Sequence, residues 1–382
     1  MKKIEEIFEK VMPYFMKFAS SKPISAIKDG FILTMPATII GSIFLLIGNF
    51  PINGWSDKMA SIFGANWQTP LNQVSGATFD ILALIAVFGI AYAYTRNEGH
   101  EAVPAGILGI ISFLIVTNAF VVTEAGEVVG GVIPKAWTGG QGMICAIIIG
   151  LLVGFIYSLF LNKDIRIKMP ESVPTGVSNA FTALIPGVVI GTGSMIIYVV
   201  CDAVKGISMT EIIYEILQIP MQSLSDSLIG IILIMFFISL LWWCGIHGPN
   251  VVMAIMSPIL TANALDNQSI IDAGQALVAG DNAKIVTVQM VDIFGKFGGA
   301  GITLGFVIAG IIIAKSKQMK SISKLSLIPG VFNINEPVIF GLPIVFNPLM
   351  LIPFIIVPVL AVIMTYSSIA LGFIQPFTAT QV

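Results

Sequence analysis

Long runs of apolar residues, with very few charges between them, constrain this chain more than any other feature. Of its 382 residues, 56% are apolar and only 10% are charged, whereas a soluble domain carries about 25% charged residues. So few charges cannot cover the surface of a soluble protein of this length. The sequence therefore predicts an all-α polytopic membrane protein with about nine to ten transmembrane helices. It excludes a soluble enzyme, a disordered chain and a nucleic-acid-binding protein.

Individual membrane spans follow from the apolar runs, because about 20 largely apolar residues cross the hydrocarbon layer. Several runs are short or are interrupted by glycine and proline. The predicted spans are Phe31–Phe50, Phe79–Tyr94, Val103–Val122, Gly142–Leu161, Phe181–Cys201, Leu228–Trp243, Gly301–Ala314 and Leu349–Phe373.

The distribution of lysine and arginine predicts the orientation, because both are enriched in cytoplasmic loops. With a cytoplasmic N-terminus, 14 of the 19 basic residues lie inside. The reverse orientation leaves only five inside. The 14 residues are Lys2, Lys3, Lys10, Lys17, Lys22, Lys28, Arg96, Lys163, Arg166, Lys168, Lys315, Lys317, Lys320 and Lys324. The N-terminal stretch 1–23 is typical of an amphipathic helix on the membrane surface.

Two interrupted segments in the second half must lie at membrane depth. The predicted orientation makes two spans run from the outside to the inside, Leu228–Trp243 and Gly301–Ala314. A segment between them must therefore cross outward, and Gly245–Leu260 is the only candidate. Leu325–Pro348 must enter and leave on the same side, which predicts a re-entrant hairpin. Irregular backbone at this depth is tolerated only inside protein or beside a watery cavity. Two such segments indicate a transport site.

Glu336 is the only acidic residue between Gly301 and Val382, and it follows Asn335 between two apolar runs. A carboxylate inside a membrane costs about 2.5–3.5 kcal/mol on insertion scales. One interpretation is a boundary charge that reaches out to water. The other is a ligand-site carboxylate, which accepts hydrogen bonds from hydroxyl groups or takes a proton as a general base.

The segment before Leu260 contains an imidazole and two indoles. His247 lies in the turn CGIHGPN, where it is either a satisfied buried histidine or a ligand contact. Trp242 and Trp243 precede it, and they are either residues of an interfacial belt or a stacking face for a sugar ring. The second histidine, His100, is typical of a loop residue.

Glycine also surrounds Gln141 in WTGGQGM (Trp137–Met143). Gly142 and its neighbours either let the backbone approach a ligand or form a flexible turn before the next helix. Further along, the loop Glu171–Phe181 has turn chemistry and predicts a linker between two domains.

Several other chemistries are not supported by the sequence. Its three cysteines are far apart and form no metal-ligand spacing, so no metal or cofactor is expected. No Walker A pattern or potassium-filter sequence occurs. The remaining amide, carboxylate, imidazole and indole groups suit an uncharged polyhydroxylated solute. A proton-coupled secondary transporter, with Glu336 as the proton carrier, is the alternative, and a channel or sensor is a third class.

Three segments carry a resemblance to a known family. They are KPISAIKDGFILTMPATIIGSIFLLIGNFP (Lys22–Pro51), GIHGPNVV (Gly245–Val252) and NINEPVIFGLPIVFNP (Asn333–Pro348). All three resemble the membrane component IIC of the bacterial phosphotransferase system, in its lactose, cellobiose and chitobiose branch. Because members of this family run longer, we expect a further helix beyond residue 382.

This resemblance implies a transport function and a domain plan. A IIC protein of the bacterial cytoplasmic membrane binds an external disaccharide, such as cellobiose or diacetylchitobiose, and presents it to a cytoplasmic phospho-IIB protein, which phosphorylates it. The family implies a homodimer with an N-terminal dimerisation domain, here 1–170. A C-terminal substrate domain, here 171–382, moves as an elevator and contains hairpins near 245–260 and 325–348.

The resemblance also assigns roles to single residues. His247 and Glu336 match hairpin residues that contact the sugar, and Trp242 matches an aromatic residue that stacks near the sugar ring. Gln141 and Gly142 resemble a substrate-contacting segment of the first domain. Asn335 is carried over as a neighbour in the motif. The phosphoryl donors are expected on separate chains.

Overall fold

The computed structural model describes Lys17, Phe50 and residues 20–48, 54–123, 126–170, 172–244, 248–342, 344–345 and 347–379. The chain divides into two compact units, Met1–Met221 with Thr380–Val382, and Gln222–Ala379. This division lies later in the chain than the predicted domain boundary at residue 170. The functional roles of the predicted domains stay a prediction. The predicted N-terminal amphipathic helix lies outside the described residues, apart from its last part.

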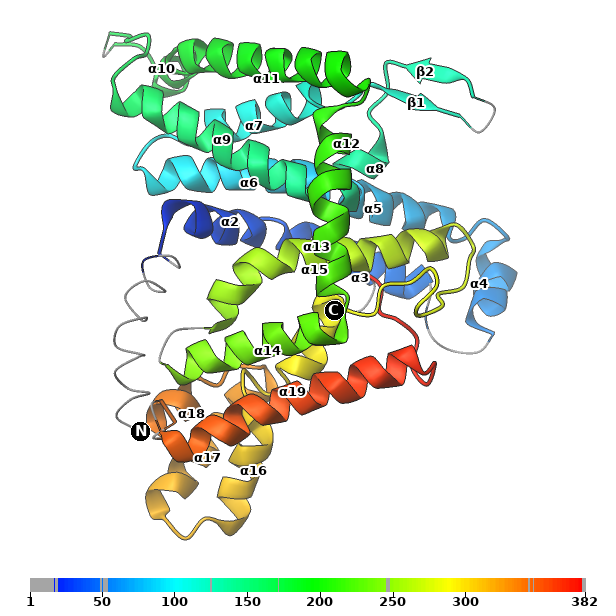
Figure 1. Cartoon of the computed structure of the whole chain (residues 1–382), viewed down its shortest axis with the longest axis vertical. Coiled ribbons are helices and arrows are strands. Elements are labelled where there is room, and N and C mark those ends of the chain that lie inside the picture. Colours follow the sequence, from blue (N-terminus) through cyan, green and yellow to red (C-terminus); the bar gives the residue numbers. More distant parts are fainter. Residues whose placement is uncertain are drawn as a thin grey trace. The chain divides into compact units, whose positions relative to one another are not determined.

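The described part of the first unit consists of helices and one β-hairpin (Figure 1). Its helices up to the hairpin are α2 (Lys22–Ile32), α3 (Met35–Gly48), α4 (Trp55–Phe63), α5 (Thr69–Phe79), α6 (Leu82–Asn97) and α7 (Val103–Ile115). Those after it are α8 (Lys135–Thr138), the 3₁₀ turn η1 (Gly140–Gly142), α9 (Met143–Asn162), α10 (Thr175–Thr182), α11 (Leu184–Lys205), α12 (Met209–Ile213) and the π-helical turn η2 (Tyr214–Gln218). Helix α13 (Ile219–Ser225) crosses the unit boundary.

The β-hairpin corrects one predicted span. Strands β1 (Phe120–Val122) and β2 (Val128–Gly130) pair antiparallel, with Phe120 opposite Gly130. Helix α7 therefore ends well before Val122, the predicted end of its span. The residues of β1 are apolar and partly β-branched, so they suit a strand as well as a span, and hydropathy alone does not separate the two structures.

Helix α6 is the centre of the first unit, and glycines bring its neighbours into close contact. A Cβ atom on Gly89 would lie 2.5 Å from the carbonyl oxygen of Gly30, which belongs to α2. On the α9 side, a Cβ atom on Gly154 would lie 2.6 Å from the Cβ of Tyr94. Small residues at such positions let helices approach closely where no water is available to drive their association.

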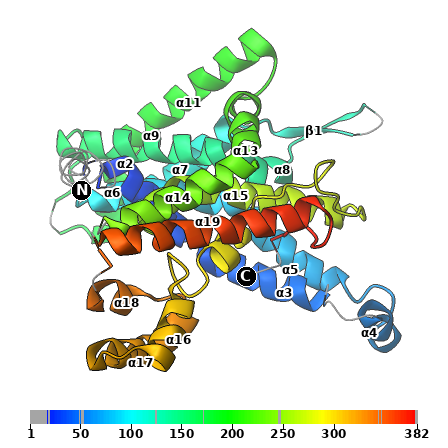
Figure 2. The same cartoon turned by 60° about the horizontal axis from the view of Figure 1, so that its bottom comes forward.

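After the end of α13, the second unit contains seven helical elements among its described residues. They are α14 (Leu228–Trp243), α15 (Gly248–Asp272), the π-helical turn η3 (Met290–Gly295), α16 (Thr303–Ile313), α17 (Lys317–Val331), α18 (Glu336–Gly341) and α19 (Pro348–Ala370). Helices α16 and α17 lie side by side, as Figures 1 and 2 both show. The Oγ of Ser227 accepts the backbone N–H of Gly230 and caps α14.

Helix α15 differs from the segment that the sequence predicts. It begins at Gly248 and continues through Pro258 to Asp272, well beyond the predicted end at Leu260. At a rise of 1.5 Å per residue its 25 residues extend over about 38 Å, but α15 is not among the described helices that are both long and apolar enough to cross a membrane. The outward crossing that the sequence predicts for Gly245–Leu260 therefore stays a prediction.

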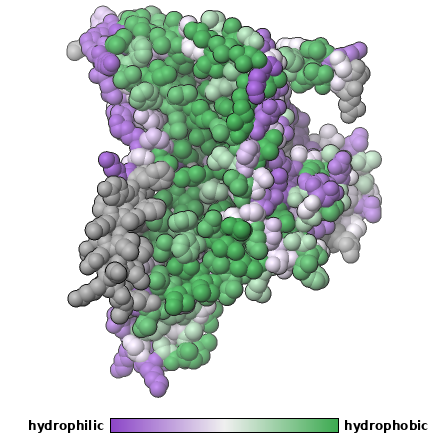
Figure 3. Space-filling model, in the orientation of Figure 1, coloured by the Kyte–Doolittle hydropathy of each residue, from purple (hydrophilic) through white to green (hydrophobic). Residues whose placement is uncertain are grey.

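Among the described helices, four are long and apolar enough to cross a membrane, and a bent pair raises the number to five. The four are Thr69–Asn97, Gly140–Asn162, Thr175–Lys205 and Leu349–Ala370, and the pair is Met209–Ser225 with Leu228–Trp243, bent by 79°. Apolar side chains also cover much of the face in view (Figure 3). The protein is thus a mostly helical multi-span membrane protein, and the full number of spans stays a prediction.

Buried polar side chains hold the non-helical segment Lys284–Val286 in the second unit. Asn267 accepts the N–H of Lys284 and donates to its carbonyl oxygen, both at 2.7 Å. The Oδ1 atom of Asp226 accepts the next two backbone N–H groups, and Asn263 donates to the last carbonyl oxygen of the segment at 2.7 Å. These bonds replace the ladder or helix partners that a buried backbone otherwise needs.

Asp266 also belongs to α15, and its Oδ2 accepts a hydrogen bond from Nε2 of Gln222 at 2.9 Å.

Candidate functional site

The motif NINEP is fixed by a glycine loop 35 residues earlier in the chain. Asn333 follows α17 in the left-handed region, with φ of 61°, which asparagine tolerates better than most residues. Its Oδ1 accepts the backbone N–H of Gly298 at 2.7 Å. The next asparagine in the motif, Asn335, donates from Nδ2 to the carbonyl oxygen of Ala300 at 2.6 Å.

The glycine loop, Gly298–Gly301, has a backbone that needs glycine. Gly298, Gly299 and Gly301 have φ of 73°, 95° and 85°, and a Cβ atom on Gly299 would overlap the side chain of Asn335. The hydroxyl of Thr303 donates to the carbonyl oxygen of Gly298 at 2.8 Å, which closes the loop onto the start of α16. The loop and the motif therefore form one connected structure within the second unit.

Glu336 begins helix α18 directly after this anchor. Its side chain lies outside the described part of the structure, so the backbone alone locates it. Asn335, the residue before it, is only 3% exposed, and Val338 and Ile339 on the same helix are buried. The anchored loop and the packed helix hold the backbone of Glu336 on both sides. This support is what a residue of a preorganised site requires.

His247 lies outside the described residues, but the helices on both sides of it are described. Helix α14 ends at Trp243 and α15 begins at Gly248. A Cβ atom on Gly248 would overlap the carbonyl oxygen of Ile238. The glycine that follows His247 is therefore required for close packing between α14 and α15, apart from any contact with a ligand.

Both indoles at the end of α14 are buried, Trp242 at 3% exposure and Trp243 at 5%. Burial excludes an exposed interfacial belt for these two residues. The Nε1 of Trp243 donates to the carbonyl oxygen of Asn347 at 2.8 Å, and Asn347 caps α19. Stacking of a sugar ring on Trp242 requires the packing around this ring to open, and its role stays a prediction.

Gln141 and Gly142 belong to the first unit, where they form η1 immediately before α9. A Cβ atom on Gly142 would overlap the carbonyl oxygen of Trp137. Gln218 donates from Nε2 to the carbonyl oxygen of Gly140 at 2.9 Å, and it fixes the same turn. The turn before the next helix is therefore present, and a contact of these residues with substrate stays a prediction.

The loop Gly298–Gly301 is the part of the site that we did not predict from sequence. Its signal in the sequence is the cluster FGGAG before an apolar run, which indicates special backbone but does not identify the residues that contact it.

Within the described part of the chain, no three His, Cys, Asp or Glu side chains are grouped so that they could hold a metal ion.

Comparisons with known proteins define the class. Residues 28–358 match the family described as "Phosphotransferase system, EIIC". The lichenan permease IIC component of Bacillus subtilis is 40% identical over 98% of this chain and 83% of its own length. The cellobiose-specific EIIC component of Geobacillus stearothermophilus is 36% identical over 97% and 83%.

A solved structure agrees with these relatives. The transporter ChbC, the IIC component of the N,N'-diacetylchitobiose-specific phosphotransferase system, is 41% identical, with a TM-score of 0.92 over 98% of this chain and 87% of that one. The fold is therefore that of a multi-pass transport protein of the bacterial cell membrane. The chain belongs to the EIIC family of the phosphotransferase system, in its lactose, cellobiose and chitobiose branch, as its motifs predict.

Proposed function

We propose that this chain is a sugar permease that binds a β-linked disaccharide, such as cellobiose or diacetylchitobiose, and carries it across the cell membrane. The observation that carries the proposal is the likeness to ChbC along almost the whole chain, at 41% identity and a TM-score of 0.92. Three relatives that match almost the whole chain are named for lichenan, oligo-β-mannosides and cellobiose.

The proposed chemistry is transfer of a phosphoryl group to the bound sugar. A cytoplasmic phospho-IIB protein supplies the phosphoryl group from its own chain, so the permease contributes recognition and orientation. Glu336 accepts a hydrogen bond from the hydroxyl that becomes phosphorylated and takes its proton, or it serves as a ligand only. His247 donates to a second hydroxyl, and Trp242 provides a stacking face.

The remaining residues support this arrangement. Asn335 holds the backbone beside Glu336 through its bond to Ala300, and Gln141 and Gly142 contribute from the first unit. We further propose a homodimer, an elevator movement of the substrate domain, a cytoplasmic N-terminus, and nine to ten spans with two re-entrant hairpins. The charged product leaves an otherwise neutral site readily, which makes transport directional without a coupled ion.

A proton-coupled secondary transporter is the second candidate. The observation that favours it is the isolation of Glu336, the only acidic residue between Gly301 and Val382. A lone carboxyl group at membrane depth is suited to carrying a proton. The two functions differ in their source of free energy, which is phosphoryl transfer in one case and the proton gradient in the other.

A binding screen with cellobiose, lactose and diacetylchitobiose tests the proposed substrate class. Calorimetry on the purified permease should detect at least one of the three. The α-linked disaccharide maltose serves as a control of matched size and should bind at least tenfold more weakly. Failure of all three sugars to bind, or equal binding of maltose, would contradict the proposal.

A further inference from the structure

Four exposed lysine side chains lie where α16 is joined to α17 in the second unit. Lys315 belongs to the turn between the helices, and Lys317, Lys320 and Lys324 belong to α17. Figure 3 shows hydrophilic side chains at this end of the two helices, at the bottom of the view. No acidic residue occurs between positions 301 and 335, and within the described part of the chain none of the four lysines forms an ion pair. Their charges are therefore available to a partner outside the chain.

Three of these lysines share one face of α17. Lys317, Lys320 and Lys324 are three and four residues apart, which is the spacing of neighbours on a helix surface. Ser323 is fully buried and faces α16, where a Cβ atom on Gly310 would overlap its hydroxyl. At about 100° per residue, the three lysines are centred about 90° around the helix from Ser323. The lysine face, which we define as these three residues, is therefore separate from the contact with α16.

Neither helix stability nor membrane topology explains the lysine face. Lys317 is the first residue of α17, and positive charge at a helix N-terminus opposes the helix dipole. The enrichment of lysine in cytoplasmic loops does not require the lysines to share a face. In the first unit, by contrast, Lys22 pairs with Glu98 and Arg166 pairs with Asp164. Unpaired positive charge on one face is suited to attracting an anionic partner.

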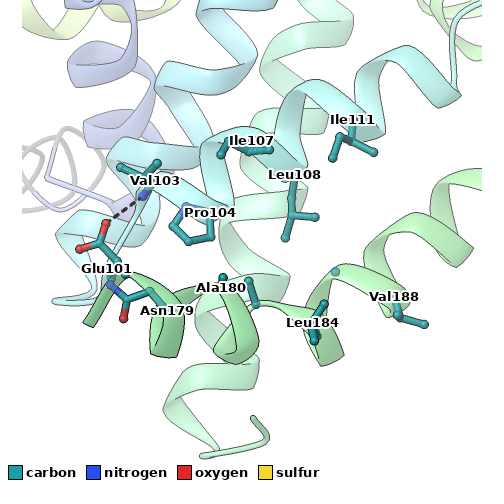
Figure 4. Close-up of a pocket in the computed structure, with 13 residues that line it drawn as sticks. Glu101, Val103, Pro104, Ile107, Leu108, Ile111, Asn179, Ala180, Leu184 and Val188 are labelled. Carbon is teal, nitrogen blue, oxygen red and sulfur yellow. Dashed lines mark hydrogen bonds between the residues drawn. The ribbon is translucent and has the colours of Figure 1, made fainter. Parts of the chain in front are cut away.

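The predicted orientation places the lysine face on the cytoplasmic side, where a phospho-IIB protein acts. The inference therefore rests on the proposed function. The phosphoryl group alone gives such a partner about two negative charges. The groove of about 700 Å³ between α7 and α11 in the first unit is less suitable for an anionic partner, because its walls are apolar and the charged residue that lines it, Glu101, is acidic (Figure 4).

Helix α17 connects the lysine face to the candidate site. It leads into Asn333 and Asn335, which are bound to the glycine loop, and Glu336 follows. Lys324 lies about 10 Å along the helix from its last residue, Val331. A partner that covers a standard area of about 800 Å² has a footprint with a radius of about 16 Å. A protein that docks at the segment holding Glu336 would therefore also reach the lysine face.

We propose that the lysine face is a docking surface for phospho-IIB. Its ammonium groups pair with anionic groups on the face of phospho-IIB that carries the phosphocysteine. Complementary charge at the rim of an interface acts mainly on the rate of association. Each exposed ion pair is worth up to about a fivefold change in affinity, and two such pairs up to about 25-fold.

The KM for phospho-IIB in phosphoryl transfer to the disaccharide tests the lysine face, with the full chain in nanodiscs of phosphatidylcholine, a lipid without net charge. Lys320→Gln combined with Lys324→Gln should raise this KM about 5- to 25-fold. The kcat at saturating phospho-IIB and the affinity for sugar should stay at wild-type values. In about 0.5 M salt the difference in KM should largely disappear.

The matched control is Lys58→Gln combined with Lys205→Gln, because both lysines are exposed and are predicted to lie outside. It should keep the wild-type KM. An unchanged KM in the Lys320 and Lys324 variant, or an equal rise in the control, would overturn the proposal. A loss of sugar affinity would also overturn it, because the lysines would then support the fold of the site.

Two further outcomes separate this proposal from its alternatives. A rise in KM that occurs only in nanodiscs of phosphatidylglycerol would assign the lysine face to anionic lipid and would overturn docking of phospho-IIB. Absence of any transfer by the wild-type permease would contradict the proposed function, and the docking surface with it. Transfer by the wild type with the same KM in the variant would contradict the docking surface alone.

Discussion

Glu336→Gln is expected to reduce phosphoryl transfer to the bound disaccharide by about 10²–10⁴-fold, because it removes the group that takes the proton of the reacting hydroxyl. Sugar binding should weaken about 10- to 150-fold, since a hydrogen bond to a charged group is worth about 1.5–3 kcal/mol. Both quantities are measurable on purified protein, by calorimetry with the sugar and by product formation with phospho-IIB.

Glu127 provides the matched control for this substitution, because it is an exposed acidic residue of the β-hairpin and is not part of the NINEP motif. Glu127→Gln should keep wild-type binding and transfer. Weaker binding of Glu336→Gln with undiminished transfer at saturating sugar would restrict Glu336 to recognition. Wild-type values of both quantities would remove it from the site.

Gly142→Ala is expected to cost about 3 kcal/mol of stability, at the upper end of the range for overpacking. The added methyl group would overlap the carbonyl oxygen of Trp137, and a backbone atom cannot move aside by a change of rotamer. The turn that starts α9 would have to shift. The expected result is a lower unfolding temperature in detergent and a lower yield of monodisperse protein.

The same substitution separates two explanations of this glycine. Gly193 on α11 is the control, because its Cβ position has open space, and Gly193→Ala should be close to wild type. If Gly142 serves only the approach of a ligand, Gly142→Ala would be as stable as the control and would lose sugar affinity alone. That result would contradict the packing argument.

Local composition was sufficient to predict several parts of the fold. Helix α14 has the predicted bounds Leu228–Trp243 because its run is uniformly apolar and Ser227 caps its start. The predicted span that begins at Val103 was too long, because the apolar strand β1 continues the hydropathy signal beyond the end of α7. It also missed the break between α2 and α3, since residues on both sides of the break are apolar.

In the candidate site, too, the local motif was predictable from the sequence, whereas its contacts with distant residues were not. The motif NINEP identified the family from sequence, and the family match confirms this identification. Its contacts with Gly298 and Ala300 join residues 35 positions apart, and neither hydropathy nor spacing predicts which loop a side chain will hold. Similarly, the glycines around Gln141 indicated special backbone, whereas the carbonyl group of Trp137 that excludes a side chain at Gly142 became known only from the packing.

Uptake of radiolabelled disaccharide into vesicles whose membrane holds this permease as its sole protein tests the central claim most directly. We predict accumulation of sugar phosphate when phospho-IIB is enclosed in the vesicles, and the same accumulation when a proton uncoupler is added. Uptake without phospho-IIB that the uncoupler abolishes would contradict this account and would establish a proton-coupled transporter.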